Sequence, residues 1–303
     1  MAEVIAFMGE HREEFGVEPM CRVLSIAPST WHAYTARQAR PDLRPTRAKE
    51  DEKLSAAILR VHAENFGVYG ARKVWRQLLR EGFDIGRDRV ARLMCKLGLE
   101  GVRRGRRVKT TVSDKTAPCP LDKVNRRFTA DRPNRLWVSD FTYVPTWAGM
   151  VYVAFVIDVF ARRIVGWRAS QTASAQFVLD ALEQAVHMRR PTEPGLIHHS
   201  DRGVQYVSIK YTERLVDAGI EPSVGSVGDS YDNALAETVI GLFKTEVIHR
   251  QGPWRSLAAV EVATMNWVDW YNNRRLLGSI GNIPPAEAEA NYHAALEAAP
   301  MAA

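Results

Sequence analysis

The feature that most constrains the fold is a run of three neighbouring β-rich segments followed by helical patterns that alternate with single short strands. The first segment, NRLWVSDFTYVPTW (134–147), alternates in polarity, and MVYVAFVIDVFARRIVGWRAS (150–170) supplies two more strands around FARR. Next come a helical pattern, the short strand GLIHHS (195–200), a second helical pattern and a last strand beginning EPSV (221–224). This order predicts an α/β domain with a mixed five-stranded sheet flanked by helices.

Residues 1–100 are predicted to form a small all-helical region of the helix-turn-helix type. Within 69–101, apolar residues recur at helical spacing on both sides of the turn EGFDIG (81–86), and the second helix is basic. We favour DNA binding by this pair over an ordinary solvated hairpin, whereas both alternatives stay open for a shorter helical pair within 18–38. The candidate DNA-binding residues on or near the basic helix are Arg87, Arg89 and Arg92.

Residues 101–130 are predicted to be a basic linker that leads to a second domain at 131–295, which includes C-terminal helices. Basic residues outnumber acidic ones over 1–127, whereas acidic residues predominate from 128 onward, within a net charge of +6. A basic segment without periodicity can follow DNA phosphates, although a solvated tether is the alternative. The candidate phosphate-binding residues of the linker are Arg103, Arg104, Arg106 and Arg107.

The composition argues against several classes of protein. No run of 18 apolar residues is present, so no transmembrane helix is expected. The N-terminus lacks the basic start and the small-residue cleavage site of a secretory signal. The three cysteines, Cys21, Cys95 and Cys119, lie far apart, which argues against a disulfide framework and against a cysteine zinc site. We expect a protein of the reducing cytoplasm with no membrane partner.

Three acidic residues occupy positions where carboxylates are unusual. Asp140 lies within the first strand, Asp201 directly follows the strand GLIHHS, and Glu237 lies near the start of a helix behind a loop rich in Gly and Ser. A buried carboxylate is costly unless it is paired or binds a metal ion. Carboxylates from two strands and one helix can converge on hard cations, and an all-oxygen ligand set suits Mg²⁺ or Mn²⁺. The pattern therefore predicts a site for two such ions, as in phosphodiester chemistry.

Two more residues of the Glu237 helix are candidates for DNA contacts. Lys244 follows Glu237 by seven residues, two turns later on the same face, where it would face the DNA backbone. Asn233 lies one turn before Glu237 on that face, near the metals or the DNA. The alternatives are a solvated surface lysine and an asparagine that caps the helix together with Asp232.

Other polar residues of the strands have structural alternatives. His198 and His199 precede Asp201 and point in alternating directions. One of them could donate to the metal site, and the alternative is that they are packed histidines. Asp158 is expected to be structural and to pair with Arg162 or Arg163 at the turn that follows it.

Several motifs, in order along the chain, carry a resemblance to a known family. WVSDFTYV, HHSDRGVQY and SVGDSYDNALAETVIGLFKTE resemble the Asp, Asp and Glu blocks of the DDE transposases and retroviral integrases. The 35 residues between Asp201 and Glu237, and the lysine seven residues after Glu237, belong to that pattern. VYGARKVWRQLL and WYNNRRLLGSIGNIPPAEAE resemble the N-terminal and C-terminal blocks of second-frame (OrfB) transposases of bacterial insertion sequences. The similarity extends over residues 17–292.

The resemblance implies an RNase-H-like fold in which Asp140, Asp201 and Glu237 are the catalytic residues and the ligands of two Mg²⁺ or Mn²⁺ ions. It implies a transposase that cleaves DNA at the ends of an insertion sequence and transfers a 3′-hydroxyl to a target phosphate. The implied partners are double-stranded DNA of terminal repeats and target, further copies of the chain, and an upstream-frame product with which the chain is fused or on which it depends, unless it acts alone. The implied location is the bacterial cytoplasm, in association with the nucleoid. The alternatives are a plain RNase-H-like nuclease and a DNA-binding repressor or decayed transposase without activity.

Overall fold

The computed structural model describes residues 2–103, 105, 124, 128–201, 205–206, 208–224 and 233–298. The chain divides into two compact units, Met1–Arg60 and Val61–Ala303. Ahead of the sheet the elements are α1 (Ala2–Phe15), α2 (Val17–Val23), α3 (Pro28–Ala39), η1 (Pro41–Leu43), α4 (Thr46–Glu64), α5 (Ala71–Arg80) and α6 (Arg87–Lys96). No strand occurs in the described part of residues 2–103, so the all-helical character expected of this region is confirmed there.

Helices α5 and α6 form the expected helix-turn-helix pair. The inward side chains Leu78 of α5 and Val90 and Leu93 of α6 are fully buried, which explains the helical spacing of apolar residues on both sides of the turn. In the first unit, a separate small core holds α1, α2 and α3 together. It consists of Ile5, Met8, Met20, Cys21 and Trp31.

The mixed five-stranded sheet is present as expected. Its strands are β1 (Leu136–Thr146), β2 (Gly149–Asp158), β3 (Arg163–Ser170), β4 (Ile197–Ser200) and β5 (Glu221–Val224), in the order β3-β2-β1-β4-β5. The first three strands are antiparallel neighbours, whereas β4 runs parallel to β1 and β5 parallel to β4. The two parallel strands are reached through α7 (Ala175–Arg189) and α8 (Ile209–Asp217).

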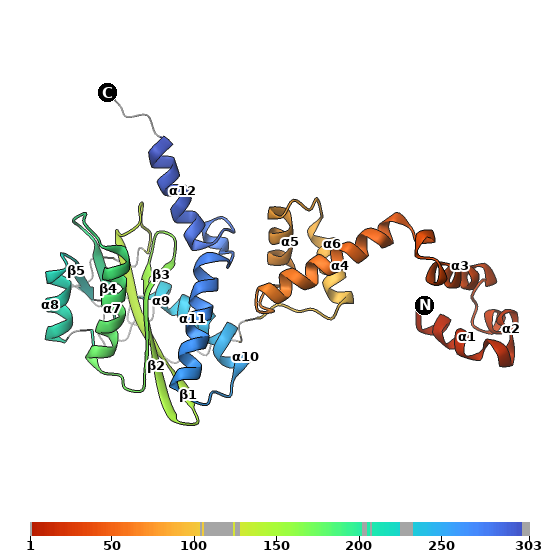
Figure 1. Cartoon of the computed structure of the whole chain (residues 1–303), viewed down its shortest axis with the longest axis horizontal. Helices are drawn as coiled ribbons and strands as arrows, with labels where there is room; N and C mark the ends of the chain where they lie inside the picture. The colour runs from red at the N-terminus through yellow and green to blue at the C-terminus, as the bar shows by residue number, and fades with distance from the viewer. Residues whose placement is uncertain are drawn as a thin grey trace, which may run out of the picture. The chain divides into compact units, whose positions relative to one another are not determined.

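Helices cover both faces of the sheet (Figure 1). On one face, α7 and α8 enclose a core that includes Trp137 and Phe177, and Gly166 lets α7 approach β3, since a Cβ there would lie 2.1 Å from the Ala181 carbonyl oxygen. On the other face, Phe155 of β2 packs against Phe243 and against Trp267 of α11. The elements after β5 are α9 (Ala234–Phe243), the π-helix η2 (Lys244–Ile248), α10 (His249–Gln251), α11 (Leu257–Asn273), η3 (Gly278–Ile280) and α12 (Pro285–Ala298). None of the helices in the described residues is long and apolar enough to cross a membrane.

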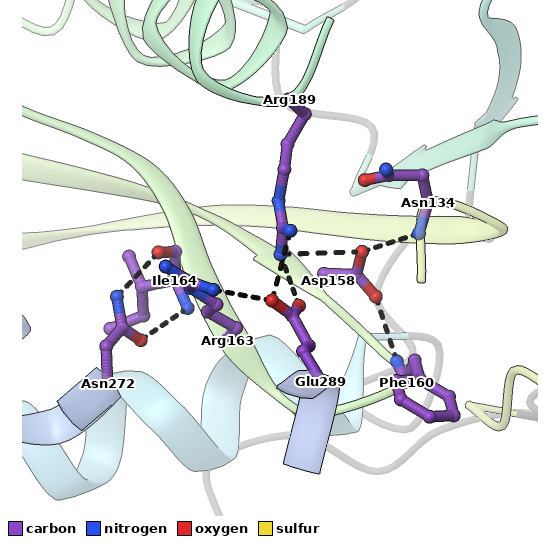
Figure 2. Close-up of polar contacts among 8 residues, drawn as sticks. All are labelled: Asn134, Asp158, Phe160, Arg163, Ile164, Arg189, Asn272 and Glu289. Atoms are coloured by element: carbon purple, nitrogen blue, oxygen red, sulfur yellow. Dashed lines mark hydrogen bonds and ion pairs between the residues drawn. The ribbon is translucent and has the colours of Figure 1, made fainter. Parts of the chain in front are cut away.

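Helix α12 is attached to the sheet by a buried carboxylate between two arginines (Figure 2). Glu289, which is 4% exposed, accepts from Arg163 Nη1 of β3 at 2.5 Å and from Arg189 Nη1 of α7 at 3.1 Å. The two cations offset the charge of the carboxylate, which would otherwise be costly to bury.

Asp158 adjoins this cluster (Figure 2). The prediction that it pairs with Arg162 or Arg163 was wrong. Its carboxylate accepts from the backbone N–H of Asn134 at 2.7 Å and of Phe160 at 3.0 Å, and it lies 3.9 Å from Arg189 Nη2. Arg163 does not pair with Asp158 because its guanidinium is engaged by the carboxylate of α12. Asp158 is structural, as expected, but through a cation on α7 and two backbone donors.

Candidate active site

The pairing of β1 with β4 brings two of the three acidic residues together. Ser139 of β1 is the register partner of Ser200 of β4, so the next positions of the parallel pair are Asp140 and Asp201. Neighbouring strands lie about 4.8 Å apart. Asp140 is also opposite Phe155, whose ring packs on α9 and α11, so its side chain lies on the face that α9 covers.

The electrostatic surroundings of Asp140 disfavour its charged form. The pKa of its carboxyl group is raised to about 7, first by burial and then by the negative charge of Asp201. Glu237 adds to the rise, whereas the hydrogen bond from Phe141 N, at 2.8 Å, and the charge of Lys244 lower the pKa. Since two further carboxylates raise its pKa, Asp140 belongs to one electrostatically coupled acidic cluster.

Helix α9 brings the third acidic residue to this strand. Glu237 lies in the first turn of α9 and its N–H donates to the Asn233 carbonyl at 3.0 Å. The Asn233 side chain is 5% exposed and its Nδ2 donates to the Ser139 carbonyl at 2.7 Å, one residue before Asp140. It makes no side-chain capping bond. In this arrangement Asn233 ties the start of α9 to β1, and its contact with DNA stays a prediction.

The donor set of the cluster fits a hard divalent cation. Asp140, Asp201 and Glu237 offer carboxylate oxygens only, and their mutual repulsion is of the kind that a divalent charge offsets. Within the described part of the chain, no three His, Cys, Asp or Glu side chains are close enough to hold one ion. The three carboxylates are thus coupled through their charges but do not form a closed ligand set.

Lys244 lies on the same face of the helix as Glu237, because both residues line one groove of about 270 Å³. Lys244 is half-buried and is the first residue of the π-helix that continues α9. Burial lowers the pKa of Lys244, and the charge of Asp140 raises it. Its Nζ lies 5.0 Å from the centre of the Tyr143 ring, a neighbour on β1 that the sequence did not indicate as part of the site.

A buried ion pair on the opposite side of this helix was also missed from the sequence. Glu246 is 4% exposed and accepts from Arg275 Nε at 3.0 Å and from Trp267 Nε1 at 3.1 Å. It is nine residues from Glu237, half a turn away around a regular helix, so it faces the core. A second Glu in a largely apolar helical segment was the available signal, because the partners of Glu246 lie on α11 and just beyond it.

The two histidines of β4 are packed in the interior. His198 Nε2 lies 3.1 Å from the Tyr211 hydroxyl, and His199 Nδ1 lies 2.9 Å from Ser223 Oγ. Burial lowers the pKa of His198 to about 3, so its ring is neutral. These contacts agree with the packed-histidine alternative.

The basic candidates are distributed over α6 and the linker. Arg87 and Arg92 are exposed on α6, Arg89 is partly exposed, and Arg87 Nη2 lies 2.9 Å from Asp88. Arg103 is exposed at the start of the linker. The remaining candidates, Arg104, Arg106 and Arg107, lie outside the described residues.

Family models match three parts of the chain, of which the two integrase core matches overlap. An integrase core domain matches residues 130–230, a second integrase core domain model matches 218–285, and an HTH-like domain matches 49–107. The first two together span the sheet, α9 and α11, and the third spans α5 and α6.

The chain is similar over nearly its whole length to transposases. It is 58% identical to the transposase for insertion sequence element IS629 of Shigella sonnei, over 94% of this chain and 95% of that protein. It is 54% identical to a putative transposase for IS986/IS6110 of Mycobacterium tuberculosis (89% and 97%). It is 30% identical to transposase InsF for insertion sequence IS3A of Escherichia coli (93% and 97%).

Solved structures with a more distant likeness include the HTLV-2 integrase catalytic core domain in complex with magnesium. The TM-score is 0.41 at 15% identity, over 52% of this chain and 98% of that one. A simian T-cell lymphotropic virus intasome in complex with a PP2A regulatory subunit gives a TM-score of 0.46 at 12% identity, over 81% and 76%. On the sequence relatives and the family models, the chain belongs to the IS3 family of insertion sequence transposases, with an integrase core and an HTH-like domain.

Proposed function

We propose that the chain cleaves DNA at the ends of its insertion sequence and joins the resulting 3′-hydroxyl to a target phosphate. The observation that carries the proposal is the β1–β4 register, which sets Asp140 beside the position of Asp201. Burial first, and then the charges of Asp201 and Glu237, raise the pKa of Asp140 to about 7. Neighbouring carboxylates repel one another, and burial strengthens that repulsion, so such a cluster favours a site for cations.

In this proposal the three carboxylates are the catalytic residues and hold two Mg²⁺ or Mn²⁺ ions. When bound, two such ions activate the attacking oxygen and stabilise the leaving oxygen of a phosphodiester. The chain positions the carboxylates: the β1–β4 register sets Asp140 beside Asp201, and Asn233 fixes the start of the helix that carries Glu237. Lys244, two turns further along the same groove, binds a phosphate next to the reacting one.

The proposed organisation separates recognition from catalysis. Residues 1–100 recognise double-stranded terminal-repeat DNA, with Arg87, Arg89 and Arg92 of α6 at the DNA, and residues 131–295 carry out the chemistry on end and target DNA. The linker at 101–130 contributes phosphate contacts, and Gly105 lines the same groove as Glu237 and Lys244. Since two ends must be joined, we expect several copies of the chain on the DNA and, in the element, fusion to an upstream-frame product.

The test is Mg²⁺-dependent joining of labelled DNA from the ends of the element by the full chain. Asp201→Asn should abolish joining and leave binding of the ends nearly unchanged, because it removes a metal ligand and no DNA contact. Asp217→Asn, at an exposed position at the end of α8, is the matched control and should join normally. Joining by Asp201→Asn at the wild-type rate contradicts the assignment. Degradation without joining would favour the nuclease, and binding without either reaction the repressor.

A further inference from the structure

The outer end of the β1–β2 ribbon extends beyond its neighbours in the sheet (Figure 1). β4 pairs only with residues 136–139 of β1, and the pairing of β3 with β2 begins at Tyr152. Apart from a single bridge between Thr146 and Trp254, residues 143–151 therefore pair only within the ribbon. The turn is held by a bond from Thr146 Oγ1 to the Gly149 carbonyl at 2.7 Å and by one from Trp147 N to the Trp254 carbonyl at 3.0 Å.

This protruding end carries two large aromatic side chains in solvent. Tyr143 is 58% exposed and Trp147 is 70% exposed. Each ring has a cation beside it: Lys244 Nζ lies 5.0 Å from the centre of the Tyr143 ring, and the Arg255 guanidinium lies 5.6 Å from that of Trp147. We call these four residues the aromatic ledge.

The charge around the ledge favours a polyanionic partner. Residues 141–156 contain no acidic side chain. The charged groups beside the two rings, Lys244 and Arg255, are both positive. Alternating rings and cations suit nucleic acid, because the rings stack on bases while the cations meet phosphates. The ledge is also continuous with the proposed active site, since Lys244 belongs to both and lines the groove of Glu237.

We propose that the aromatic ledge binds unpaired bases of the DNA strand beside the reacting phosphate. The inference rests on the proposed function. At about 3.3 Å per residue, Tyr143 lies about 10 Å and Trp147 about 23 Å along β1 from Asp140. Since stacked duplex DNA rises about 3.4 Å along its axis per nucleotide, these distances correspond to about three and about seven nucleotides of stacked strand. Stacking there stabilises an opened end of the duplex and so assists delivery of the strand to the carboxylates.

Photocrosslinking tests the contact without requiring joining. DNA ends that carry 5-iodouracil three to seven nucleotides from the joining phosphate are bound to the full chain in EDTA and irradiated, and the crosslinked peptides are mapped by mass spectrometry. The expected crosslink is in the peptide that contains Trp147, retained in Trp147→Phe and lost in Trp147→Ala. Crosslinks at these positions only to peptides outside 141–156 overturn the proposal. Because no joining is needed, this result is independent of the metal-dependent chemistry.

Joining assays then test the function of the ledge. Trp147→Ala should lower joining of fully paired ends by about tenfold, within the range of base stacking on an aromatic ring, and Trp147→Phe should restore most of it. Ends mismatched at these nucleotides should rescue Trp147→Ala, since opening is then no longer required. Met150→Ala, an exposed apolar residue on the same ribbon, is the matched control and should join as wild type. An equal defect in Met150→Ala, or no rescue by mismatches, indicates a protein contact and refutes the ledge as a base-binding site. A wild-type rate for Trp147→Ala refutes it as well.

Discussion

The integrase core contains two groups of buried or partly buried carboxylates whose surroundings differ. Glu289 lies between Arg163 and Arg189, and Asp158 accepts two backbone N–H groups and lies near Arg189 (Figure 2). Asp140 instead has two further carboxylates as electrostatic neighbours, and it forms no ion pair with any lysine or arginine among the described residues.

The causes of the pKa shifts show the difference most clearly. Burial raises the pKa of both Asp158 and Asp140. At Asp158 the next causes, a backbone donor and Arg189, lower the pKa, whereas at Asp140 the next cause, Asp201, raises it further. Glu246 lies on the same helical segment as Glu237, but it resembles Glu289 and Asp158, because Arg275 offsets its charge. Carboxylates with cations from the chain beside them hold the fold together, whereas burial and a neighbouring carboxylate disfavour the charged form of Asp140.

The largest expected effect is the loss of stability when the arginine-paired group is broken. Glu289→Gln leaves two arginines without their buried counter-charge, which should lower the free energy of unfolding by about 3–5 kcal/mol. Glu287→Gln is the matched control two residues away. Its bond to Arg80 Nη1, at 3.0 Å, lies at the surface, so its loss should be under about 1 kcal/mol. Urea unfolding at pH 7 measures both, and similar losses would remove the distinction between the two positions.

Removing a charge from the acidic cluster is expected to raise the free energy of unfolding instead of lowering it. In EDTA at pH 8, Asp140→Asn should raise the free energy of unfolding by on the order of 2 kcal/mol, since it removes a charge that burial and Asp201 disfavour. The folded pKa lies above the ordinary value of 3.8, so the contribution of Asp140 to stability is full below about pH 4 and is lost as the pH rises to about 7. The gain from the substitution should therefore shrink as the pH falls from 7 to 4. A destabilised variant at pH 8 contradicts this view of the cluster.

Local patterns in the sequence were sufficient to predict the sheet and to predict on which strand or helix each acidic residue lies. The alternation around Asp140 and the polar run after β4 are visible within ten residues, and the mixed five-stranded sheet they predict is confirmed. Conversely, the sequence could not set the register that pairs Ser139 with Ser200, which decides whether Asp140 adjoins Asp201.

Contacts between distant segments were beyond sequence analysis for the same reason. Asn233 bonds a carbonyl 94 residues earlier, and Asp158 meets Arg189 instead of the arginines that follow it in the chain. Trp147 was overlooked because its exposure is a property of the ribbon's length relative to β4. Local periodicity carries no information on such lengths and pairings.

Divalent ions should distinguish the acidic cluster from the arginine-paired carboxylates by a smaller change in stability. Mg²⁺ at ten times its dissociation constant should stabilise the wild type by about 1.4 kcal/mol, or a few degrees in Tm, because it binds the folded cluster. The shift should vanish in Asp140→Asn and persist in Glu287→Gln, whose carboxylate lies outside the cluster. Thermal unfolding with and without Mg²⁺ measures it, and an undiminished shift in Asp140→Asn would place the ion elsewhere.

The smallest effect on stability is expected at Lys244, whose positive charge lowers the pKa of Asp140. Burial lowers the pKa of Lys244 more than Asp140 raises it, so the ammonium group gains little from the carboxylate and is not its counter-ion. Lys244→Ala should change the free energy of unfolding by less than about 0.5 kcal/mol and leave the Mg²⁺ shift intact. It should nevertheless weaken engagement of DNA ends and lower joining, and Lys244→Arg should retain part of the activity, because charge is kept while the geometry changes. Joining rates measured against Mg²⁺ and against DNA concentration distinguish a DNA-binding lysine from one that supports the metal site. A defect corrected by extra Mg²⁺ but not by extra DNA would assign Lys244 to the metal site. Lys244 would then serve the carboxylates, as Arg189 serves Asp158 and Glu289.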